Sequence, residues 1–406
     1  MSTPVFSTPL SLAMARSPQF ITAKNNALAL DTLTEMDLNL RIRTGVLAAS
    51  GSFNYSLSKD YSINQVINFE ISDLIRSEFY HDFSVWNDIG YTQSPQGEAL
   101  WIVPEGSVTF SNNGASPANE TFPDESPTAY AYLTTDGWAT RDNIAPVAVS
   151  QLVLATSRDR QVLIGNYESL ALNNSTANDL AEIDIVWNNG EGDTFYTSAS
   201  NPVPPDPSSN NSQNLVIYAG VGPANLENNP YLDDTIKPSN HEAGDYYDVI
   251  LKDSGGDTIT TVRYYLICEP KYDPVQVAFI NRFGVADFIT FFKRSDERGN
   301  FTQDSYQKSI YNDGFTTPSL EIGKYTSFNV NSRNTLTLNT GFVDQDYDET
   351  IEDILMSEYV AVYTNSNWVS AVPNRGSIEY QKSVNTKLIN YTMSFDFGFD
   401  ERSLVR

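Results

Sequence analysis

The sequence predicts a mainly β protein with two or three antiparallel sandwich-like or barrel-like modules and one clear short helix near its C-terminal end. The composition is rich in Tyr (23) and Phe (21), whose flat rings pack well on pleated surfaces. Short apolar segments with period-2 alternation recur along the chain, and Gly, Pro, Asn and Ser separate them. A chain of 406 residues is also long for one hydrophobic core, so several modules are expected.

Shifts in composition divide the chain into four regions. Residues 1–22 carry three prolines among small polar residues, which predicts an extended N-terminal arm. Residues 23–170 form a first β module, and residues 171–270 form a second. Residues 271–406 form a third module, which contains the helix.

The first module shows its pattern most clearly at residues 36–47. Leu38, Leu40 and Ile42 alternate there with polar residues, which predicts a half-buried strand. Further strands are predicted at residues 65–75, 97–110, 129–135 and 151–157.

The second module begins after a polar break at residues 171–180. The Pro-rich stretch 200–214 has no periodicity and predicts an exposed loop. Residues 246–267 contain two strand patterns joined across Ser254, Gly255 and Gly256. Because these residues tolerate the positive φ of tight turns, this segment predicts a β-hairpin.

The third module contains the predicted helix near residues 346–357. Asp346 and Glu349 fit an N-cap and its reciprocal partner. The predicted apolar face consists of Tyr347, Ile351, Ile354 and Leu355. Six apolar residues alternate strictly with others over residues 389–399, which predicts a strand.

Charge and cysteine usage limit the classes of function. The 25 Lys and Arg residues against 51 Asp and Glu residues give a formal net charge of −26, which argues against tight binding of nucleic acid. Cys268 stands alone, so no internal disulfide forms, and we expect it to be a small buried hydrophobe. The N-terminus lacks a signal-peptide pattern and no apolar run is long enough to span a membrane. We therefore expect synthesis in the cytoplasm without a membrane anchor.

Histidine chemistry has little support in this sequence. The chain has two histidines, His81 and His241, and neither accompanies a nucleophile motif. His241 lies in a polar segment that predicts a surface loop. One cysteine and two histidines also cannot supply a zinc site without carboxylates.

Two other motifs fail on spacing. Gly220 and Gly222 open a G-x-G pattern, but Asn225 occupies its last position, so we interpret the segment as a turn. Asp344 and Asp348 belong to an alternating acidic run like the start of a calcium loop. The required Gly and Glu are missing, so the acidic residues fit the first turn of a helix better. No metal or cofactor is expected.

The tryptophans are the remaining candidates for ligand contacts. Exposed rings would offer a stacking platform for sugars, but each tryptophan lies within or beside a predicted strand, which favours packing in a core or interface. The five residues are Trp86, Trp101, Trp138, Trp187 and Trp368.

The segment AFINRFGVADFITFFKR, residues 278–294, is the most aromatic in the chain. Its periodicity predicts two strands about a turn at Gly284, with the rings mostly buried. It resembles the N-[RK]-x-G-x-x-[DE]-[YF]-x-x-F segment of virion proteins of tailed bacteriophages, especially those that infect Bacteroidetes-type hosts. The matching positions are Asn281, Arg282, Gly284, Asp287, Phe288 and Phe291.

Downstream the resemblance continues through the predicted helix and the closing strands, over about residues 270–400. It implies a non-enzymatic structural protein of the tail, neck or baseplate, an acidic virion component made in the host cytoplasm. Such a protein assembles as multiple symmetric copies, in a ring or tube, and contacts other virion proteins.

Two alternatives remain open. One is a receptor-binding or carbohydrate-binding adhesion protein, in which loops such as 103–128 and 200–245 carry recognition. The other is a polysaccharide-degrading enzyme, since 51 acidic residues guarantee some pair of carboxylates at a suitable distance.

Overall fold

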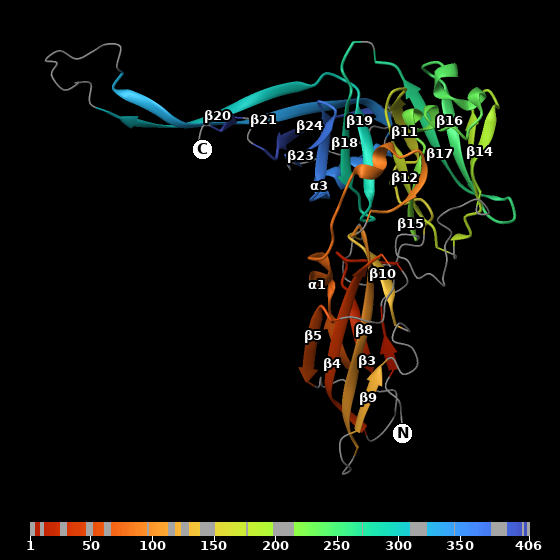
Figure 1. Ribbon diagram of the computed structural model, residues 1–406, viewed down its shortest axis with the longest axis vertical. Coiled ribbons are helices and arrows are strands. Elements are labelled where there is room, and N and C mark those ends of the chain that lie inside the picture. The colour runs from red at the N-terminus through yellow and green to blue at the C-terminus, as the bar shows by residue number, and fades with distance from the viewer. Residues whose placement is uncertain are drawn as a thin grey trace. The chain divides into compact units, whose positions relative to one another are not determined.

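The computed structural model confirms a mainly β protein with mostly antiparallel sheets (Figure 1). It describes residues 5–8, 12–24, 31–45, 52–60, 66–95, 97–112, 118–122, 130–138, 151–175, 178–197, 215–269, 271–308, 323–344, 346–374, 388–399 and 402–403. The predicted loop at 200–214 lies outside these residues.

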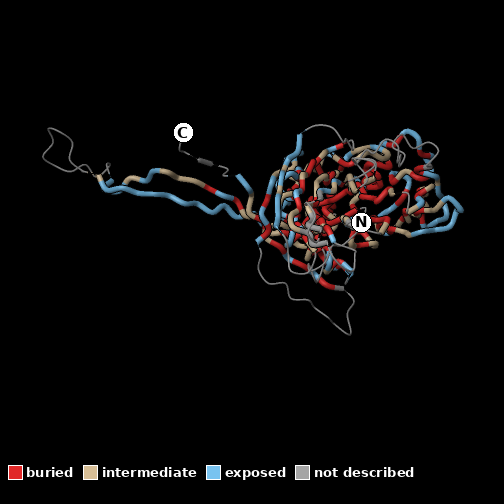
Figure 2. Tube along the Cα trace, turned by 90° about the horizontal axis from the view of Figure 1, so that it is seen from below, coloured by how far each residue is buried: buried red, intermediate tan, exposed pale blue. Residues whose placement is uncertain are grey.

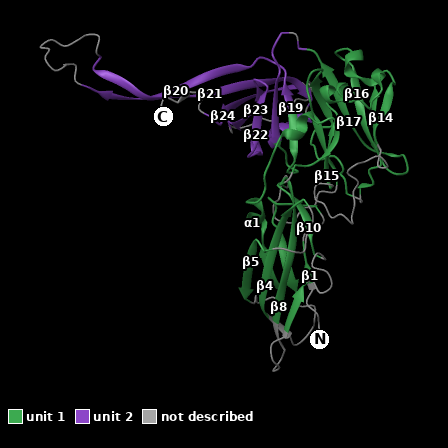
Figure 3. Cartoon of the chain, in the orientation of Figure 1, with its two compact units in different colours: residues 1–268, 280–288 green, residues 269–279, 289–406 purple. Residues whose placement is uncertain are grey.

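The chain divides into two compact units (Figure 3). Unit 1 comprises Met1–Cys268 with Ile280–Phe288, and unit 2 comprises Glu269–Phe279 with Ile289–Arg406. The predicted third module was expected to begin at residue 271. Instead, the segment 280–288 belongs to unit 1, because its turn packs and hydrogen-bonds there, as described below.

The first hydrophobic core of unit 1 lies between two sheets and forms the first sandwich. One sheet has the order β1 (Val5–Ser7), β3 (Phe20–Lys24), β6 (Val66–Glu70). The other has the order β2 (Leu12–Met14), β10 (Tyr132–Thr135), β8 (Ala99–Asn112), β4 (Asp31–Thr44), β5 (Tyr55–Asp60), and β9 (Ala118–Phe122) also pairs with β8. Leu38, Leu40 and Ile42 of β4 are buried, which confirms the predicted alternation.

Two segments of the first sandwich differ from the prediction. The expected N-terminal arm supplies strands instead: β2 pairs in parallel with β10, and Ala13 is buried in the core. The expected strand 65–75 ends at Glu70 and continues as helix α1 (Ser72–Arg76). Ile71 and Ile75 are both buried at a spacing of four residues, so the helical period determines the second half of that segment.

The second core of unit 1 lies between a five-stranded and a three-stranded sheet, which form the second sandwich. The larger sheet has the order β11 (Asp159–Leu163), β17 (Thr258–Ile267), β16 (Tyr246–Lys252), β13 (Glu182–Trp187), β14 (Gly192–Thr197). The smaller has the order β12 (Ser169–Asn173), β15 (Val216–Gly220), β7 (Gly90–Gln93). Short helices also belong to unit 1: η1 (Ser84–Asn87), α2 (Pro223–Glu227), η5 (Asp234–Ile236) and η6 (Pro238–Asn240).

The predicted hairpin of the second module is confirmed, because β16 and β17 are antiparallel neighbours. Gly256 has φ +84 in its turn. The expected strand at 151–157 contributes only an isolated bridge at Val153. Residues 220–225 are not a simple turn, because α2 begins at Pro223 directly after β15.

Unit 2 is built on an eight-stranded sheet with helix α3 (Tyr347–Met356) in its core. The sheet has the order β19 (Ala286–Phe291), β18 (Val275–Ile280), β22 (Val360–Thr364), β23 (Asn367–Pro373), β24 (Leu388–Phe397), β21 (Tyr325–Asp344), β20 (Asp296–Gln307), and β25 (Arg402–Ser403) also pairs with β21. The predicted helix and the predicted C-terminal strand are confirmed. The capping interaction is not, since Asp346 makes no side-chain capping hydrogen bond.

Strands β20 and β21 extend together as a long two-stranded ribbon (Figure 1). All 12 residues of β20 are exposed, as the pale blue tube in Figure 2 shows. We use the name ribbon for residues 296–307 with residues 325–335. No helix in the described ranges is long and apolar enough to cross a membrane.

Candidate functional site

The predicted motif lies around the tip of the β18–β19 hairpin. Five of its residues, Asn281 to Phe288, belong to unit 1, and Phe291 belongs to the core of unit 2. The predicted turn at Gly284 is confirmed, because the Gly284 N–H donates to the carbonyl of Asn281 at 2.9 Å. We use the name hairpin tip for residues 280–288.

Gly284 sits where no side chain fits. Its φ is +76, and an added Cβ would lie 2.5 Å from the backbone nitrogens of Asp136 and Gly137. The neighbouring Trp138 N–H donates to the carbonyl of Arg282 at 2.7 Å. The turn therefore packs directly on the backbone of residues 136–138.

Asn281 and Asp287 are buried polar residues with defined partners. The Asn281 amide donates to the carbonyl of Leu154 at 2.7 Å and to Asp287 Oδ2 at 3.3 Å. Asp287 Oδ1 accepts from Arg160 Nη2 at 2.7 Å and from the Phe288 N–H at 2.8 Å. These bonds compensate for the removal of two polar side chains from water.

Arg160 joins two carboxylates in the interior of unit 1. Its guanidinium pairs with Asp287 and with Glu168, and all three side chains are nearly inaccessible. Burial raises the pKa of Glu168 to about 7, while Arg160 acts in the opposite direction. Burial opposes the charge of Arg160, but the carboxylates of Asp287 and Glu168 hold its pKa well above the usual value. The arginine therefore remains a cation that balances the buried acids.

Glu98 approaches the same hairpin tip from β7–β8. Its Oε1 accepts from the Ala286 N–H at 3.0 Å and from the Tyr218 hydroxyl. Its Oε2 is buried without a hydrogen-bond partner among the described residues. Burial raises the pKa of Glu98 to about 8. We use the name tip network for Asn281, Asp287, Arg160, Glu168, Glu98 and Tyr218.

Residues 136–138, on which the turn packs, carry a second ionic cluster. Arg16 donates to both oxygens of Asp136, at 2.8 and 2.7 Å, and His81 Nε2 lies 3.1 Å from Asp136 Oδ2. Burial opposes ionisation of Asp136, but the hydrogen bonds from His81 and Arg16 hold its pKa below the usual value. Arg16 also lies 5.5 Å from the ring centroid of Trp138.

These clusters hold the hairpin tip and the backbone on which it packs. Asn281, Asp287, Arg160 and Glu168 are too deeply buried to meet a substrate. The other histidine, His241, is buried against Trp187 with ring centroids 3.5 Å apart, so the expected surface position is wrong. Among the described residues, no group of His, Cys, Asp or Glu is arranged to hold a metal.

The exposure of Cys268 and of the five tryptophans differs from residue to residue. Cys268 is exposed, because it follows the end of β17, so the expected burial is wrong. None of the five tryptophans is exposed, and Trp138 and Trp187 are buried. Trp86, Trp101 and Trp368 are half-buried.

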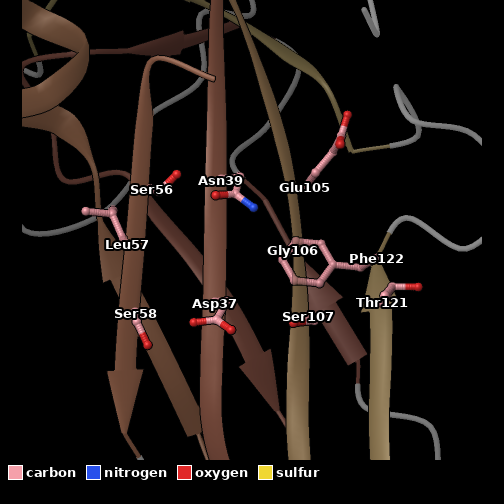
Figure 4. A pocket seen from close by; sticks show the side chains of 10 residues that line it. All are labelled: Asp37, Asn39, Ser56, Leu57, Ser58, Glu105, Gly106, Ser107, Thr121 and Phe122. Carbon is pink, nitrogen blue, oxygen red and sulfur yellow. The ribbon is translucent and has the colours of Figure 1, made fainter. Parts of the chain in front are cut away.

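A polar groove lies on the first sandwich, with a volume of about 590 Å³. Figure 4 shows Asp37 and Asn39 of β4 between Ser58 of β5 and Glu105 of β8. Period-2 alternation explains why the side chains of Asp37 and Asn39 point away from the core, since Leu38 and Leu40 of β4 point into it. Glu105 is paired with Arg41, so its charge is partly neutralised.

Parts of the expected recognition loops 103–128 and 200–245 are regular structure, and residues 113–117, 123–128 and 200–214 lie outside the described ranges. Strand β8 extends to Asn112 within the segment 103–128, and α2 with two short helices lies within 200–245. The ribbon is the more accessible surface. Its large exposed side chains are Phe301, Tyr306, Tyr325 and Phe328, with exposed fractions of 69%, 49%, 71% and 49%.

Comparison with known proteins gives little information. No family model matches the chain, and no curated protein matches it. Among solved structures, the chain is similar to the fibronectin(III)-like modules of Clostridium thermocellum CbhA at 7% identity and a TM-score of 0.17. That match covers 66% of this chain and 94% of the other. A score this low supports no inference about fold or function.

Sequence reasoning missed Arg160, Glu168 and Glu98 as partners of the hairpin tip. Each lies more than a hundred residues from the tip, and no local pattern pairs them. One signal was available: Glu168 directly precedes the largely apolar strand β12, where a buried charged side chain requires a partner.

Proposed function

We propose that this chain is a non-enzymatic virion structural protein of a tailed bacteriophage, located in the tail, neck or baseplate and assembled in multiple symmetric copies. The exposed ribbon is the observation that carries the proposal. Its strand β20 has no buried residue and lies at the edge of the sheet, where only β21 supports it among the described strands. Contact with another protein would give this ribbon the covered faces that it lacks.

Two other features support this proposal. The motif at residues 281–291 resembles virion proteins of tailed phages, and its polar residues are buried, as a structural role requires. The net charge of −26 suits partners other than nucleic acid. The titratable groups with strongly raised pKa values are inaccessible, so they are better explained by folding than by catalysis.

Two measurements test the proposal. Mass spectrometry of purified virions is expected to detect the chain, and a cryo-EM map of intact particles is expected to show repeated copies of it. Light scattering of the purified protein is expected to give a mass above that of one chain, 45.2 kDa. A protein that stays monomeric at high concentration and never occurs in virions would contradict the proposal.

The groove on the first sandwich favours a second candidate function, the binding of a polar ligand such as a carbohydrate. Asp37 and Asn39 offer acceptors and donors on an accessible sheet face. A glycan array is expected to show selective binding that Asp37→Asn weakens at least about tenfold. Asp73→Asn, at an exposed aspartate outside the groove, is the matched control. Equal binding by both variants would exclude the groove.

A further inference from the structure

The outer edge of β20 is an unpaired strand edge. In the eight-stranded sheet, β20 is the last strand, with β21 on one side and no described strand on the other. The pairing of β20 with β21 runs from Asp296 to Gln307. The outward N–H and C=O groups of such an edge are ready to pair with another strand.

This edge lacks most of the features that usually prevent pairing. Proteins protect edge strands by shortness, by charged residues and above all Lys, by Pro, or by a bulge. β20 is 12 residues long and its sequence, DERGNFTQDSYQ, contains neither Lys nor Pro. The register shift between Thr302 and Asp304 places the extra residue on β21, so β20 itself stays regular. By contrast, the edge strand β5 has only 6 residues and contains Lys59.

The charges along β20 are self-complementary about Phe301. When two copies of the strand pair antiparallel with Phe301 on a two-fold axis, Arg298 of each copy faces Asp304 of the other. Asp296 and Glu297 then face uncharged residues, Tyr306 and Ser305. Opposite charges in facing positions stabilise an antiparallel pair, and facing aromatic rings do so as well.

Neighbouring registers lack this pattern. A shift of one residue in one direction places Glu297 opposite Asp304, so that like charges face each other. A shift in the other direction places Arg298 opposite Ser305, so that no ion pair forms. The sequence of β20 therefore favours this register over its two neighbours.

The side chains needed for this register are available. Phe301 is 69% exposed, and every residue of β20 is exposed. Asp304 Oδ2 accepts a hydrogen bond from the Asn329 amide at 2.9 Å, which leaves the other carboxylate oxygen for a cation. On the regular strand, Arg298 and Asp304 share one face, and Phe301 lies on the other.

We infer that the ribbon binds a second copy of this chain by antiparallel pairing of β20 with β20, with Phe301 on the two-fold axis. This inference rests on the proposed assembly in multiple copies and names the surface that joins two of them. Each copy contributes the same edge, so the contact is isologous and closes as a pair. Pairing also joins the sheets of the two copies edge to edge and gives β20 a strand on both sides.

Charge exchange tests the register. Analytical ultracentrifugation is expected to show at least about tenfold weaker self-association for Arg298→Asp and for Asp304→Arg, because each places like charges in facing positions. The double variant Arg298→Asp with Asp304→Arg reverses both pairs and is expected to restore association to within about threefold of the original. Arg76→Asp, at an exposed residue of helix α1, is the control and should change association little.

A cross-link tests the axis. In a Cys268→Ser background, Phe301→Cys is expected to form a disulfide-linked dimer under mild oxidation, because facing strand residues lie within disulfide reach. Tyr306→Cys is the matched control. The two copies of residue 306 would lie about 33 Å apart, at ~3.3 Å per residue, and should not cross-link.

The outcomes separate this inference from the proposed function. One outcome is that the protein self-associates, the charge substitutions leave its association unchanged, and Phe301→Cys forms no cross-link. That outcome would exclude pairing through β20 but would leave the proposed assembly in multiple copies standing. If the protein is monomeric at every concentration and absent from virions, both fail. Loss of association in the single variants with recovery in the double variant would establish the register.

Discussion

The hairpin tip at residues 280–288 and the ribbon are both β-hairpin segments rich in aromatic and polar residues, yet their environments are opposite. Asn281 and Asp287 of the tip are buried, whereas every residue of β20 is exposed. In the tip, polar side chains are bound to partners of the same chain. In β20 they face water. The contrast indicates which hairpin completes the fold and which strand is available for binding.

Energetics explain why the two hairpins should respond differently to substitution. Removal of one partner from a buried ionic group leaves the others uncompensated, which costs much more than loss of an exposed pair. The ribbon buries little, so its side chains contribute little to folding. Substitutions in the two hairpins therefore separate stability from assembly.

The largest effect is expected for Arg160→Met, which leaves Asp287 and Glu168 buried without their cation. We expect the free energy of unfolding of unit 1 to fall by about 4 kcal/mol, measured by urea denaturation. Arg294→Met removes an exposed ion pair with Asp296 and should cost less than about 0.5 kcal/mol. Similar losses in both variants would contradict a special role for the tip network.

The next largest loss of stability is expected from a substitution in the backbone turn of the hairpin tip. Gly284→Ala is expected to lower the free energy of unfolding by about 3 kcal/mol, because the new methyl group meets the backbone of Asp136 at a positive φ. Gly256→Ala is the control, since Gly256 also has positive φ but has no atom within 4 Å of an added Cβ. It should cost only about 1 kcal/mol, and an equal cost at both positions would exclude the close contact.

The tip should also make stability depend on pH. The pKa of Glu98 is raised by burial to about 8 in the folded protein, from an ordinary value of 4.5. Its contribution to stability is therefore complete below pH 4.5 and is lost as the pH rises through about 8. Between pH 5 and 9, we expect urea denaturation to show a loss of a few kcal/mol that Glu98→Gln removes. If the free energy of unfolding falls with pH equally in this variant and in the original protein, the dependence belongs to other groups, such as Glu168.

The smallest effect on folding is expected in the ribbon. Phe301→Ser should change the free energy of unfolding by less than about 0.5 kcal/mol, because this side chain is mostly exposed. The same variant is expected to weaken self-association in sedimentation experiments. If Phe301→Ser instead destabilises the chain as much as Gly284→Ala, the contrast between the two hairpins disappears.

Local sequence patterns were sufficient to predict much of the fold. The alternation in β4 and β24, the turn residues between β16 and β17, and the apolar face of α3 each predicted the observed element. The predicted turn at Gly284 also agrees with the structure. In these cases, a short segment carries both the period and the turn chemistry that specify its structure.

Distant contacts explain what local patterns could not predict. Asp287 binds Arg160 across 127 positions of sequence, so its own neighbourhood indicates only a turn. Residues 296–307 have no apolar face, and their strand depends on pairing with β21. The expected N-terminal arm became strands because neighbouring β10 supplied hydrogen bonds that its own sequence does not reveal.

The hairpin tip also has a consequence for the order of synthesis. Residues 1–268 leave the ribosome before Asp287, so any pairing of Arg160 with Glu168 at that stage lacks the second carboxylate of their cluster. Unit 1 is completed only when residue 288 has emerged, by which time residues 269–279 of unit 2 have been made. A fragment that stops at Cys268 would leave Arg160 with a single buried carboxylate and Glu98 without the Ala286 N–H. Unit 1 therefore cannot be completed before the first part of unit 2 has been synthesised.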